Sequence, residues 1–238
     1  MNIALIGYGK MGKAIEAIAL ERKHQVVLKI DENNLQDFTK ENISKADVAI
    51  EFTGPHSALD NIKKTIAFGT PLVCGSTGWT EHMKEIEDLV KQQQGTFIYA
   101  SNFSVGVNIF FEVNKRLAAL MAAREEYNVA LEEVHHTEKK DAPSGTAISL
   151  AEQVLAEVKR KKQWVNHNSD NPSELEIISQ RIDPAPGTHH VKYFSPIDDI
   201  EIIHTAHNRH GFALGAVLAA EYIRDKKGIF SMKEVLGL

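Results

Sequence analysis

Two segments of the chain combine residue types that can carry chemistry. The first, Gly7-Tyr8-Gly9-Lys10-Met11-Gly12, has the glycine spacing that lets a backbone approach a pyrophosphate closely. The second runs from His135 to Ala147 with the sequence HHTEKKDAPSGTA, and it brings imidazoles, amines and a candidate helix start together. The first segment indicates a bound dinucleotide, and the second indicates a place where an anionic substrate is reduced.

The glycine loop lies between an apolar run at residues 3–6 and a helical pattern directly after it. Gly7, Gly9 and Gly12 match the positions that turn the chain, admit the pyrophosphate and pack the helix on the strand. Asp31 ends the next apolar run, about 20 residues further on, where a carboxylate accepts hydrogen bonds from ribose hydroxyls. A tight turn that binds nothing is the alternative, but the strand, the helix and the acid around the loop favour a dinucleotide site.

The residues after the second apolar run bear on the choice of cofactor. Asp31 and Glu32 together would repel the 2′-phosphate of NADPH, and Lys10 offsets only part of that repulsion. We therefore expect the protein to use NADH at least as well as NADPH.

Two further loops combine glycine with hydroxyl side chains after apolar runs. They are Phe52-Thr53-Gly54-Pro55 and Gly75-Ser76-Thr77-Gly78. Ligands of open parallel sheets bind off the carboxyl ends of the strands, so we expect both loops to line the ribose and the nicotinamide. Ordinary turns are the alternative for each loop taken alone.

The carboxyl half of the second segment has the features of an anion-binding helix start. Pro143 keeps the preceding residues out of the helix, and Ser144 is a good N-cap. The amides of Gly145, Thr146 and Ala147 would then point out of the helix start and hold a carboxylate. A solvated polar loop before a well-capped helix is the competing interpretation.

The amino half of the same segment supplies a proton donor and a positive charge. His135 and His136 end a strand-like run, and neighbouring strand residues face opposite sides. We therefore expect one imidazole to face the site while the other reaches it from a turn or supports it. An imidazole titrates near neutral pH and can act as a general acid, whereas Lys139 offers fixed charge to a carboxylate. Hydride transfer from a nicotinamide needs such an acid, because negative charge builds on the substrate.

The elements that must position these groups follow from hydrophobic patterning. In the first hundred residues, helical patterns alternate with five strand-like runs, at 3–6, 26–30, 48–52, 72–74 and 97–99. This alternation predicts a parallel sheet with crossovers. The polar stretch 31–46 predicts a short connection rather than a long helix.

The pattern changes after residue 102, which predicts a second, α+β domain. The expected elements are a helix at 109–122 with Phe110, Val113, Leu117 and Leu120 on its buried side, a strand at 128–133, a helix at 148–158, and strands at 175–182, 190–194 and 200–207. We expect residues 164–173 to form a surface loop. A closing helix follows from Phe212, with an apolar stripe at Leu214, Val217, Leu218 and Tyr222.

Composition narrows the class of protein. The chain has 238 residues and a net charge of −5, which gives no general attraction to nucleic acid or to an anionic membrane. The single cysteine, Cys74, excludes an internal disulfide, and its apolar neighbours indicate a buried, inert thiol. No apolar run approaches the roughly 20 residues of a membrane span and no targeting signal opens the chain, so we expect a cytoplasmic protein.

Histidine spacing is the one feature that raises the question of a metal. His204, His207 and His210 lie three residues apart, but they cross a predicted strand end that separates their directions. We therefore predict no metal site. The histidines would instead make a pocket electropositive toward a dianion.

The stretch from Glu133 to Ala147, EVHHTEKKDAPSGTA, strongly resembles the signature of bacterial dihydrodipicolinate reductases, also called 4-hydroxy-tetrahydrodipicolinate reductases. Further blocks resemble the same family in the family's order. They are Phe52-Thr53, Gly75 to Trp79, Asn102 to Asn108, Gly187 to His189, and Arg209 with Phe212-Ala213 and Gly215-Ala216. The resemblance therefore covers nearly the whole chain.

This resemblance implies an α/β fold with an N-terminal Rossmann-type parallel sheet domain and a C-terminal α+β domain with an open mixed sheet. Residues 1–103, completed by C-terminal helices at 211–238, would bind the dinucleotide. Residues 104–210 would bind the substrate and build a homotetramer through their sheet. The implied reaction is hydride transfer from NADH or NADPH to a cyclic imine dicarboxylate, which gives tetrahydrodipicolinate and water in diaminopimelate and lysine biosynthesis.

The resemblance also implies residue roles. His135 would donate a proton with Lys139 as its catalytic partner, and His136, Ser144, Gly145 and Thr146 would hold the dicarboxylate. The implied cofactor contacts are Gly7, Tyr8, Gly9, Lys10, Met11, Gly12, Asp31, Phe52, Thr53, Gly75, Ser76, Thr77, Ala100, Ser101, Asn102 and Phe103.

The chain departs from the family pattern in a glycine loop one residue shorter, in Glu32 where arginine is common, and in a less glycine-rich segment at 181–189. Two other functions stay open. A different two-domain dehydrogenase would not need two histidines and a lysine before a capped Ser-Gly-Thr helix. A non-catalytic dinucleotide sensor would keep the glycine loop without an acid that faces an anion site.

Overall fold

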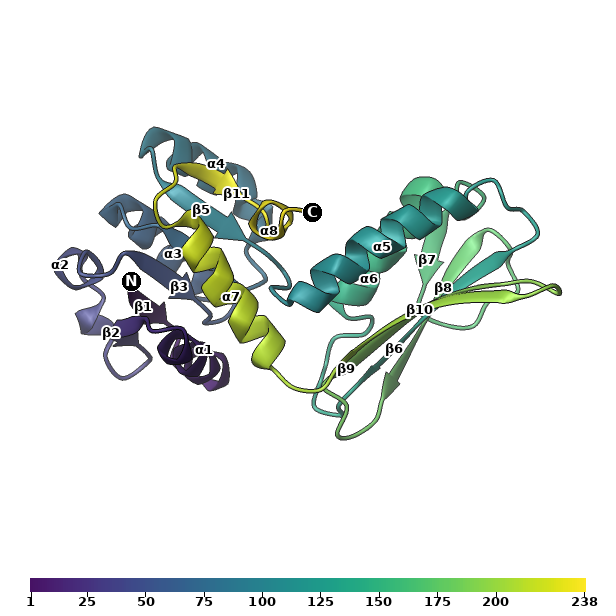
Figure 1. Cartoon of the computed structure of the whole chain (residues 1–238), viewed down its shortest axis with the longest axis horizontal. Helices are drawn as coiled ribbons and strands as arrows, with labels where there is room; N and C mark the ends of the chain where they lie inside the picture. Colours follow the sequence, from purple (N-terminus) through teal and green to yellow (C-terminus); the bar gives the residue numbers. More distant parts are fainter. The chain divides into compact units, whose positions relative to one another are not determined.

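The apolar run that opens the chain forms β1 (Asn2–Ile6), which pairs in parallel with a strand on either side. The computed structural model describes residues 1–238. The chain divides into two units, residues 1–105 with 209–238, and residues 106–208 (Figure 1). No helix of the structure has the length and apolar character that crossing a bilayer requires.

The first unit is built on a six-stranded sheet in the order β11-β5-β4-β3-β1-β2. The strands after β1 are β2 (Gln25–Ile30), β3 (Val48–Glu51), β4 (Leu72–Cys74), β5 (Thr96–Tyr99) and β11 (Gly228–Phe230), and every pair is parallel. The crossovers carry α1 (Lys10–Glu21), α3 (Ala58–Phe68) and α4 (Met83–Gln92). The predicted Rossmann-type sheet is confirmed. Because β2 and β3 flank β1 on opposite sides, the carboxyl ends of β1 and β3 form the switch point where such sheets bind ligands.

The connection after β2 is short and polar, as predicted. It holds only a turn of 3-10 helix, η1 (Leu35–Asp37), and α2 (Lys40–Ile43), whose first turn is capped because Thr39 Oγ1 accepts a hydrogen bond from Asn42 N. Ile43 is the buried anchor of this connection.

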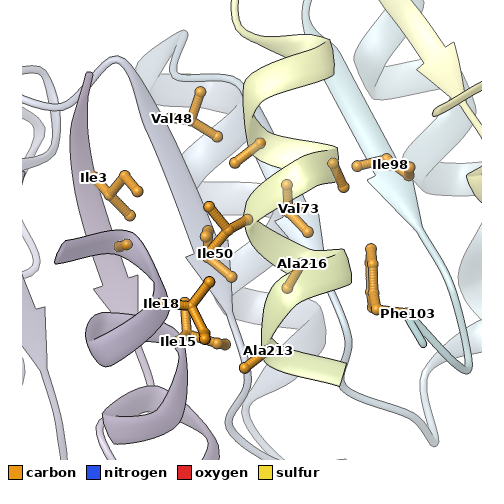
Figure 2. Packing of buried hydrophobic residues seen from close by; sticks show 14 of the residues in the cluster. Ile3, Ile15, Ile18, Val48, Ile50, Val73, Ile98, Phe103, Ala213 and Ala216 are labelled. Carbon is orange, nitrogen blue, oxygen red and sulfur yellow. The ribbon is translucent and has the colours of Figure 1, made fainter. Parts of the chain in front are cut away.

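The C-terminal segment belongs to the first unit. It forms α7 (His210–Ile223), β11 and α8 (Met232–Leu236). α7 packs beside α1 on the sheet, and Figure 2 shows Ala213 and Ala216 of α7 among Ile15, Ile18 and Ile50. On another side, α7 lies close to the segment after β5, since a Cβ at Gly215 would overlap the carbonyl of Phe103.

The predicted closing helix is confirmed as α7, and its predicted apolar residues differ in burial. Val217 is buried, but Leu214, Leu218 and Tyr222 are half-buried, and the alanines carry the close contact. β11 was not predicted, because a three-residue strand is too short to show a period, whereas α8 is one of the C-terminal helices that the family resemblance implied.

The second unit contains a five-stranded sheet in the order β10-β9-β6-β8-β7. Its strands are β6 (Asn128–His135), β7 (Gln163–Val165), β8 (Glu174–Arg181), β9 (Gly187–Phe194) and β10 (Asp199–Ala206). β8 pairs in parallel with β6 and β7, whereas β9 pairs antiparallel with β6 and β10, which confirms the predicted open mixed sheet. α5 (Val105–Met121) and α6 (Gly145–Glu157) contribute to one core with these strands.

Three details of this unit were predicted wrongly. Trp164 and Val165 pair with β8 as a strand rather than a loop. The helix predicted from residue 109 begins at Val105, where the Asn102 side chain accepts from Ser104 N at 2.9 Å. Val113 and Leu120 are 45% and 56% exposed, because the buried face of α5 instead follows Val107, Phe110, Asn114, Ala118 and Met121.

Candidate functional site

The glycine loop joins β1 to α1 in the geometry that a dinucleotide site needs. Gly7 has a φ of +96°, so the chain turns sharply between β1 and α1, and the Gly7 amide donates to Ile30 O at the end of β2 at 2.9 Å. A Cβ at Gly12 would overlap the Gly7 carbonyl, which shows how closely α1 approaches the turn. Gly9 is the exposed N-cap of α1, and nothing lies within 4 Å of where its Cβ would be.

These features fit a phosphate group at the start of α1. The amides of the first helical turn and the positive end of the helix dipole both favour an anion there. A side chain at Gly9 would occupy the open space that the backbone leaves. Lys10 and Met11, the first residues of the helix, are exposed and half-buried, respectively.

Tyr8 is held by two residues that the sequence analysis did not identify. Its hydroxyl donates to Glu16, and the Lys29 ammonium lies 2.6 Å from Glu16 Oε1 and 4.7 Å from the centre of the tyrosine ring. Hydrogen bonds from Lys29 and from Tyr8 lower the pKa of the Glu16 carboxyl. The charge of Lys29 is therefore already paired near the end of β2.

Asp31 lies at the end of β2, in a turn that orders its carboxylate. Its Oδ1 accepts from Asn33 N at 2.8 Å, and its own amide donates to Asn34 Oδ1 at 2.8 Å. Asp31 is half-buried, whereas Glu32 beside it is exposed. The carboxylate thus lies at the carboxyl end of β2, the strand that pairs with β1.

The loops after β3 and β4 are linked to each other. Thr53 N donates to Ser76 Oγ at 2.8 Å and to Glu51 Oε1 at 3.0 Å. Gly75 has no room for a side chain, because the Phe52 ring lies where its Cβ would be. Ser76 is only 6% exposed, so its hydroxyl connects the loops, while Thr53 and Thr77 are exposed.

Cys74 is buried below these loops, as predicted. Its thiol donates to Glu51 Oε2 at 3.2 Å. Burial and the neighbouring Glu51 carboxylate raise the pKa of the thiol well above its usual value, so it stays protonated and inert.

The segment after β5 completes this edge of the sheet. The Phe103 ring is buried and lies 5.8 Å from the Phe52 ring, and Ala100 packs against the same core. Ser101 is exposed and Asn102 is half-buried. All the predicted cofactor residues thus lie at the carboxyl ends of β1 to β5, which are the ends that meet at one edge of a parallel sheet.

A concavity of the first unit lies elsewhere. It has a volume of about 720 Å³ and is lined by Val90, Lys91, Gln93, Gln94, Gly95, Lys227, Gly228 and Ile229. Gly95 and Gly228 stand at the amino ends of β5 and β11, the opposite end of the strands from the glycine loop. This concavity is therefore not part of the candidate cofactor site.

In the second unit, Ser144 is the N-cap of α6, as predicted. Its Oγ accepts from Ala147 N at 3.2 Å, and its carbonyl accepts the first helical hydrogen bond from Ile148 N at 3.0 Å. The Ala147 amide is consequently used by the cap, which corrects the expectation that it points to a ligand. The amides of Gly145 and Thr146 precede the first helical bond, and Gly145 has nothing within 4 Å of its Cβ position.

Ser144 itself faces inward. It is 3% exposed, its amide donates to both carboxylate oxygens of Glu133 at 3.0 and 3.1 Å, and its Oγ lies 3.1 Å from His189 Nε2. The structure therefore places Ser144 beneath the helix start, with its polar atoms engaged by the protein.

His135 ends β6 and is buried, whereas His136 follows the strand and is half-buried. His135 is 7% exposed, and its ring lies 5.1 Å from the ring of His189. Burial, and then the neighbouring His135, lower the pKa of His189 to about 3, so His189 is neutral near pH 7. His189 and Glu133 were not predicted as site residues, although the family blocks contain both.

Lys139 lies in the turn between β6 and α6. Its ammonium pairs with both oxygens of Asp141 at 2.8 Å. Arg181 fixes this turn from β8, because its guanidinium donates to the carbonyls of Lys139 and Asp141 and to Glu133 Oε1. Glu133 thus lies beside His135 and the start of α6, and Arg181 connects Glu133 to the turn that carries Lys139.

One buried group has donor atoms close enough to raise the question of a metal. Ligand atoms of Glu133, His135 and His189 lie within 4.8 Å of one another. Both carboxylate oxygens of Glu133, however, already accept hydrogen bonds, and the Arg181 guanidinium lies 3.2 Å from one of them. A cation beside that guanidinium would be repelled, so the chemistry of the group fits a hydrogen-bonded carboxylate better than a metal ligand.

Comparison with known proteins agrees with the two units. The N-terminal model of dihydrodipicolinate reductase matches residues 1–103, and the C-terminal model of dihydrodipicolinate reductase matches residues 106–236. The 4-hydroxy-tetrahydrodipicolinate reductase of Christiangramia forsetii is 48% identical over 240 residues, which cover 99% of this chain and 98% of the relative. The enzyme of the same name from Methanocaldococcus jannaschii is 34% identical, with 98% and 81% covered.

Solved structures share the fold. Dipicolinate-bound dihydrodipicolinate reductase from Paenisporosarcina sp. TG-14 superposes with a TM-score of 0.77 at 21% identity, and 98% of each chain is covered. Aspartate semialdehyde dehydrogenase II from Vibrio cholerae reaches a TM-score of 0.57 at 12% identity, with 94% of this chain and 98% of that chain covered. The matches of both family models, together with the relative at 48% identity over the full chain, show that this chain belongs to the dihydrodipicolinate reductase family.

Proposed function

We propose that the chain catalyses the reduction of 4-hydroxy-tetrahydrodipicolinate by NAD(P)H, which gives tetrahydrodipicolinate and water. The observation that carries this function is the grouping of His135, Lys139 and a serine-capped helix start in one unit, in a chain whose other unit has a dinucleotide-binding fold. The 4-hydroxy-tetrahydrodipicolinate reductase of Christiangramia forsetii, which is named for this reaction, is 48% identical over 99% of the chain.

Each group of the second unit has a role in this reaction. His135 donates a proton to the substrate as negative charge develops, and Lys139 provides positive charge beside it. His136 and the Gly145 and Thr146 amides hold the substrate carboxylates, and the Thr146 hydroxyl adds a donor. Ser144 contributes through the cap that orients these amides, which its burial and hydrogen bonds support.

The first unit holds the cofactor. When bound, the reduced nicotinamide supplies the hydride. The loop from Gly7 to Gly12 would bind the pyrophosphate, and Asp31 the ribose hydroxyls. The loops at Phe52-Thr53 and 75–77, with residues 100–103, would line the remainder. Use of NADH at least as well as NADPH is supported by the ion pair of Lys29 with Glu16, because the carboxylates of Asp31 and Glu32 would repel a 2′-phosphate.

The division of labour and the assembly are part of the same proposal. Residues 1–103 and 211–238 form the dinucleotide-binding domain, and residues 104–210 the domain for substrate binding and oligomerisation. A cytoplasmic homotetramer would form through the sheet of the second unit. Ile203 of β10 is 57% exposed on the sheet face away from α5 and α6, which supports burial of that face by other subunits.

A steady-state assay of NADH oxidation with enzymatically made substrate tests the proposed function. Turnover that depends on this substrate supports it. Turnover with an amino acid or aspartate derivative instead would indicate another two-domain dehydrogenase. Binding of the cofactor without turnover of any of these compounds would indicate a dinucleotide sensor.

A further inference from the structure

Glu133 is the carboxylate around which the second unit arranges its reactive groups. We infer that Glu133 is a positioning residue, which orients His135 with a proton on Nδ1 and at the same time anchors the start of α6. A single buried group would then set the proton donor and the substrate-holding turn in one geometry. This inference rests on the proposed function, because that function makes His135 the proton donor of the reaction.

The burial and the hydrogen bonds of Glu133 support this role. The residue is fully buried on β6, two positions before His135, so both side chains lie on the same face of the strand. Its carboxylate accepts from Ser144 N at 3.0 and 3.1 Å and from Ser179 Oγ at 2.7 Å, and Arg181 Nη2 lies 3.2 Å away. These donors come from the start of α6 and from β8, so the carboxylate connects three elements.

Burial alone would raise the pKa of the Glu133 carboxyl. The adjacent His135 and the hydrogen bonds from Ser144 and Ser179 outweigh burial and lower the pKa well below its usual range. The Glu133 carboxyl is therefore ionised near neutral pH. A buried charge with this many donors is costly to disturb.

The same carboxylate faces one nitrogen of the proton donor. His135 Nδ1 is buried, forms no well-aligned hydrogen bond, and lies 3.3 Å from Glu133 Oε2. A proton on Nδ1 meets this negative charge favourably, whereas a bare lone pair there would be repelled. Such contacts are often long in free enzymes and tighten when the substrate is bound.

The other nitrogen is left for the substrate. Gly187 packs against the opposite edge of the ring, where a Cβ would lie 3.0 Å from His135 Nε2. Glycine therefore keeps that edge open, and Nε2 is the atom that gives up its proton. The neutral ring that remains keeps its Nδ1 proton beside Glu133.

Steady-state kinetics with Glu133→Gln, Glu133→Asp and the control Glu132→Gln test the inference. Glu132 precedes Glu133 on β6 and faces the other side of the strand. We expect Glu133→Gln to lower kcat by about 10- to 100-fold, Glu133→Asp to recover part of that loss, and Glu132→Gln to match the wild type. The dissociation constant of NADH should stay unchanged in all three. A Glu133→Gln enzyme with normal kcat, or one that loses kcat and NADH binding equally, overturns the inference.

A double-mutant cycle separates positioning from a merely structural role. If Glu133 acts through His135, Glu133→Gln should change kcat by less than about twofold in a His135→Gln background. A loss in that background as large as in the wild type contradicts the inference.

Nitrogen NMR of the wild-type protein labelled at its histidines gives a test that needs no Glu133 variant and no turnover. His135, assigned by comparison with His135→Gln, should carry its proton on Nδ1 when the ring is neutral. A proton on Nε2 instead overturns the inference even if the enzyme turns over normally. Failure of the wild type to reduce the substrate would overturn the proposed function while leaving this measurement intact.

Discussion

Lys139 and Asp141 form a bidentate ion pair, with 2.8 Å from Nζ to each carboxylate oxygen. Partial burial would raise the pKa of Asp141, but Lys139 outweighs it and lowers that pKa. The ammonium that the proposed function assigns to the substrate is thus neutralised by a neighbour in the free protein. An incoming carboxylate must compete with Asp141 for it.

Asp141→Asn should therefore lower KM for the substrate by up to about fivefold. The effect should be no larger because the ion pair that the substrate must break is partly exposed and therefore weak. Steady-state kinetics at low and high salt would measure this effect, and the difference should shrink as salt rises. Asp170→Asn, in an exposed loop, is the control. A higher KM would instead mean that Asp141 orients Lys139 productively.

Lys139→Ala should reduce kcat/KM by about 10²- to 10³-fold, because it removes positive charge from both the bound substrate and the transition state. Both kcat and KM should worsen. Lys140→Ala is the matched control, since Lys140 is adjacent and exposed. A near-normal rate for Lys139→Ala would refute the assignment of Lys139.

His135→Gln should lower kcat by about 10²- to 10⁴-fold, the usual contribution of a general acid. Fluorescence titration should give an unchanged dissociation constant for NADH, because the cofactor residues belong to the other unit. Equal losses in turnover and in cofactor binding would count against a proton-donor role.

Gly9→Ala and Gly12→Ala should fail in different ways. The position of a Gly9 Cβ is open, so alanine there should weaken NADH binding by about tenfold or more, while the free energy of unfolding changes by less than about 1 kcal/mol. A Cβ at Gly12 would overlap the Gly7 carbonyl, so Gly12→Ala should destabilise the fold by about 1 to 3 kcal/mol. Titration and chemical denaturation measure the two effects. If Gly9→Ala binds NADH with normal affinity, the assignment of phosphate binding to this loop is wrong.

His189 should make stability fall in acid. Its pKa is lowered from 6.5 to about 3 in the folded protein, chiefly by burial and then by His135, so between these values the unfolded chain binds the extra proton. Stability is therefore full above pH 6.5 and is lost as pH falls, by about 3 to 5 kcal/mol in all. Glu133 and His204, whose pKa values are also lowered, act in the same direction.

Urea unfolding of the wild type and of His189→Gln, compared between pH 7 and pH 5, measures this contribution. In the unfolded chain the pKa of Glu133 lies near its ordinary value of 4.5, so Glu133 contributes little to the change in stability between pH 7 and pH 5. The difference between the two proteins therefore reports the His189 imidazole. The variant should be less stable at pH 7 but lose less stability on acidification. Parallel curves would show that His189 is not the acid-sensitive group.

The sequence alone determined the elements whose signals are local. The glycine loop, the alternation of strands and helices, and the Ser144 cap each depend on neighbours a few residues away, and all were predicted correctly. The two-residue period of a strand, which a sequence shows directly, also places Glu133 and His135 on one face, and both are buried.

The tertiary structure decided what depends on residues distant in the chain. In the sequence, Glu133 is one of two acids in a strand of alternating pattern. Glu133 accepts hydrogen bonds from Ser144, Ser179 and Arg181 only because β6 pairs with β8 and α6 packs against them. The buried side of α5 and the strand β7 were likewise set by their partners. The reason is physical: a local pattern states which conformation a segment prefers, whereas burial and hydrogen-bond partners exist only once remote segments are packed together.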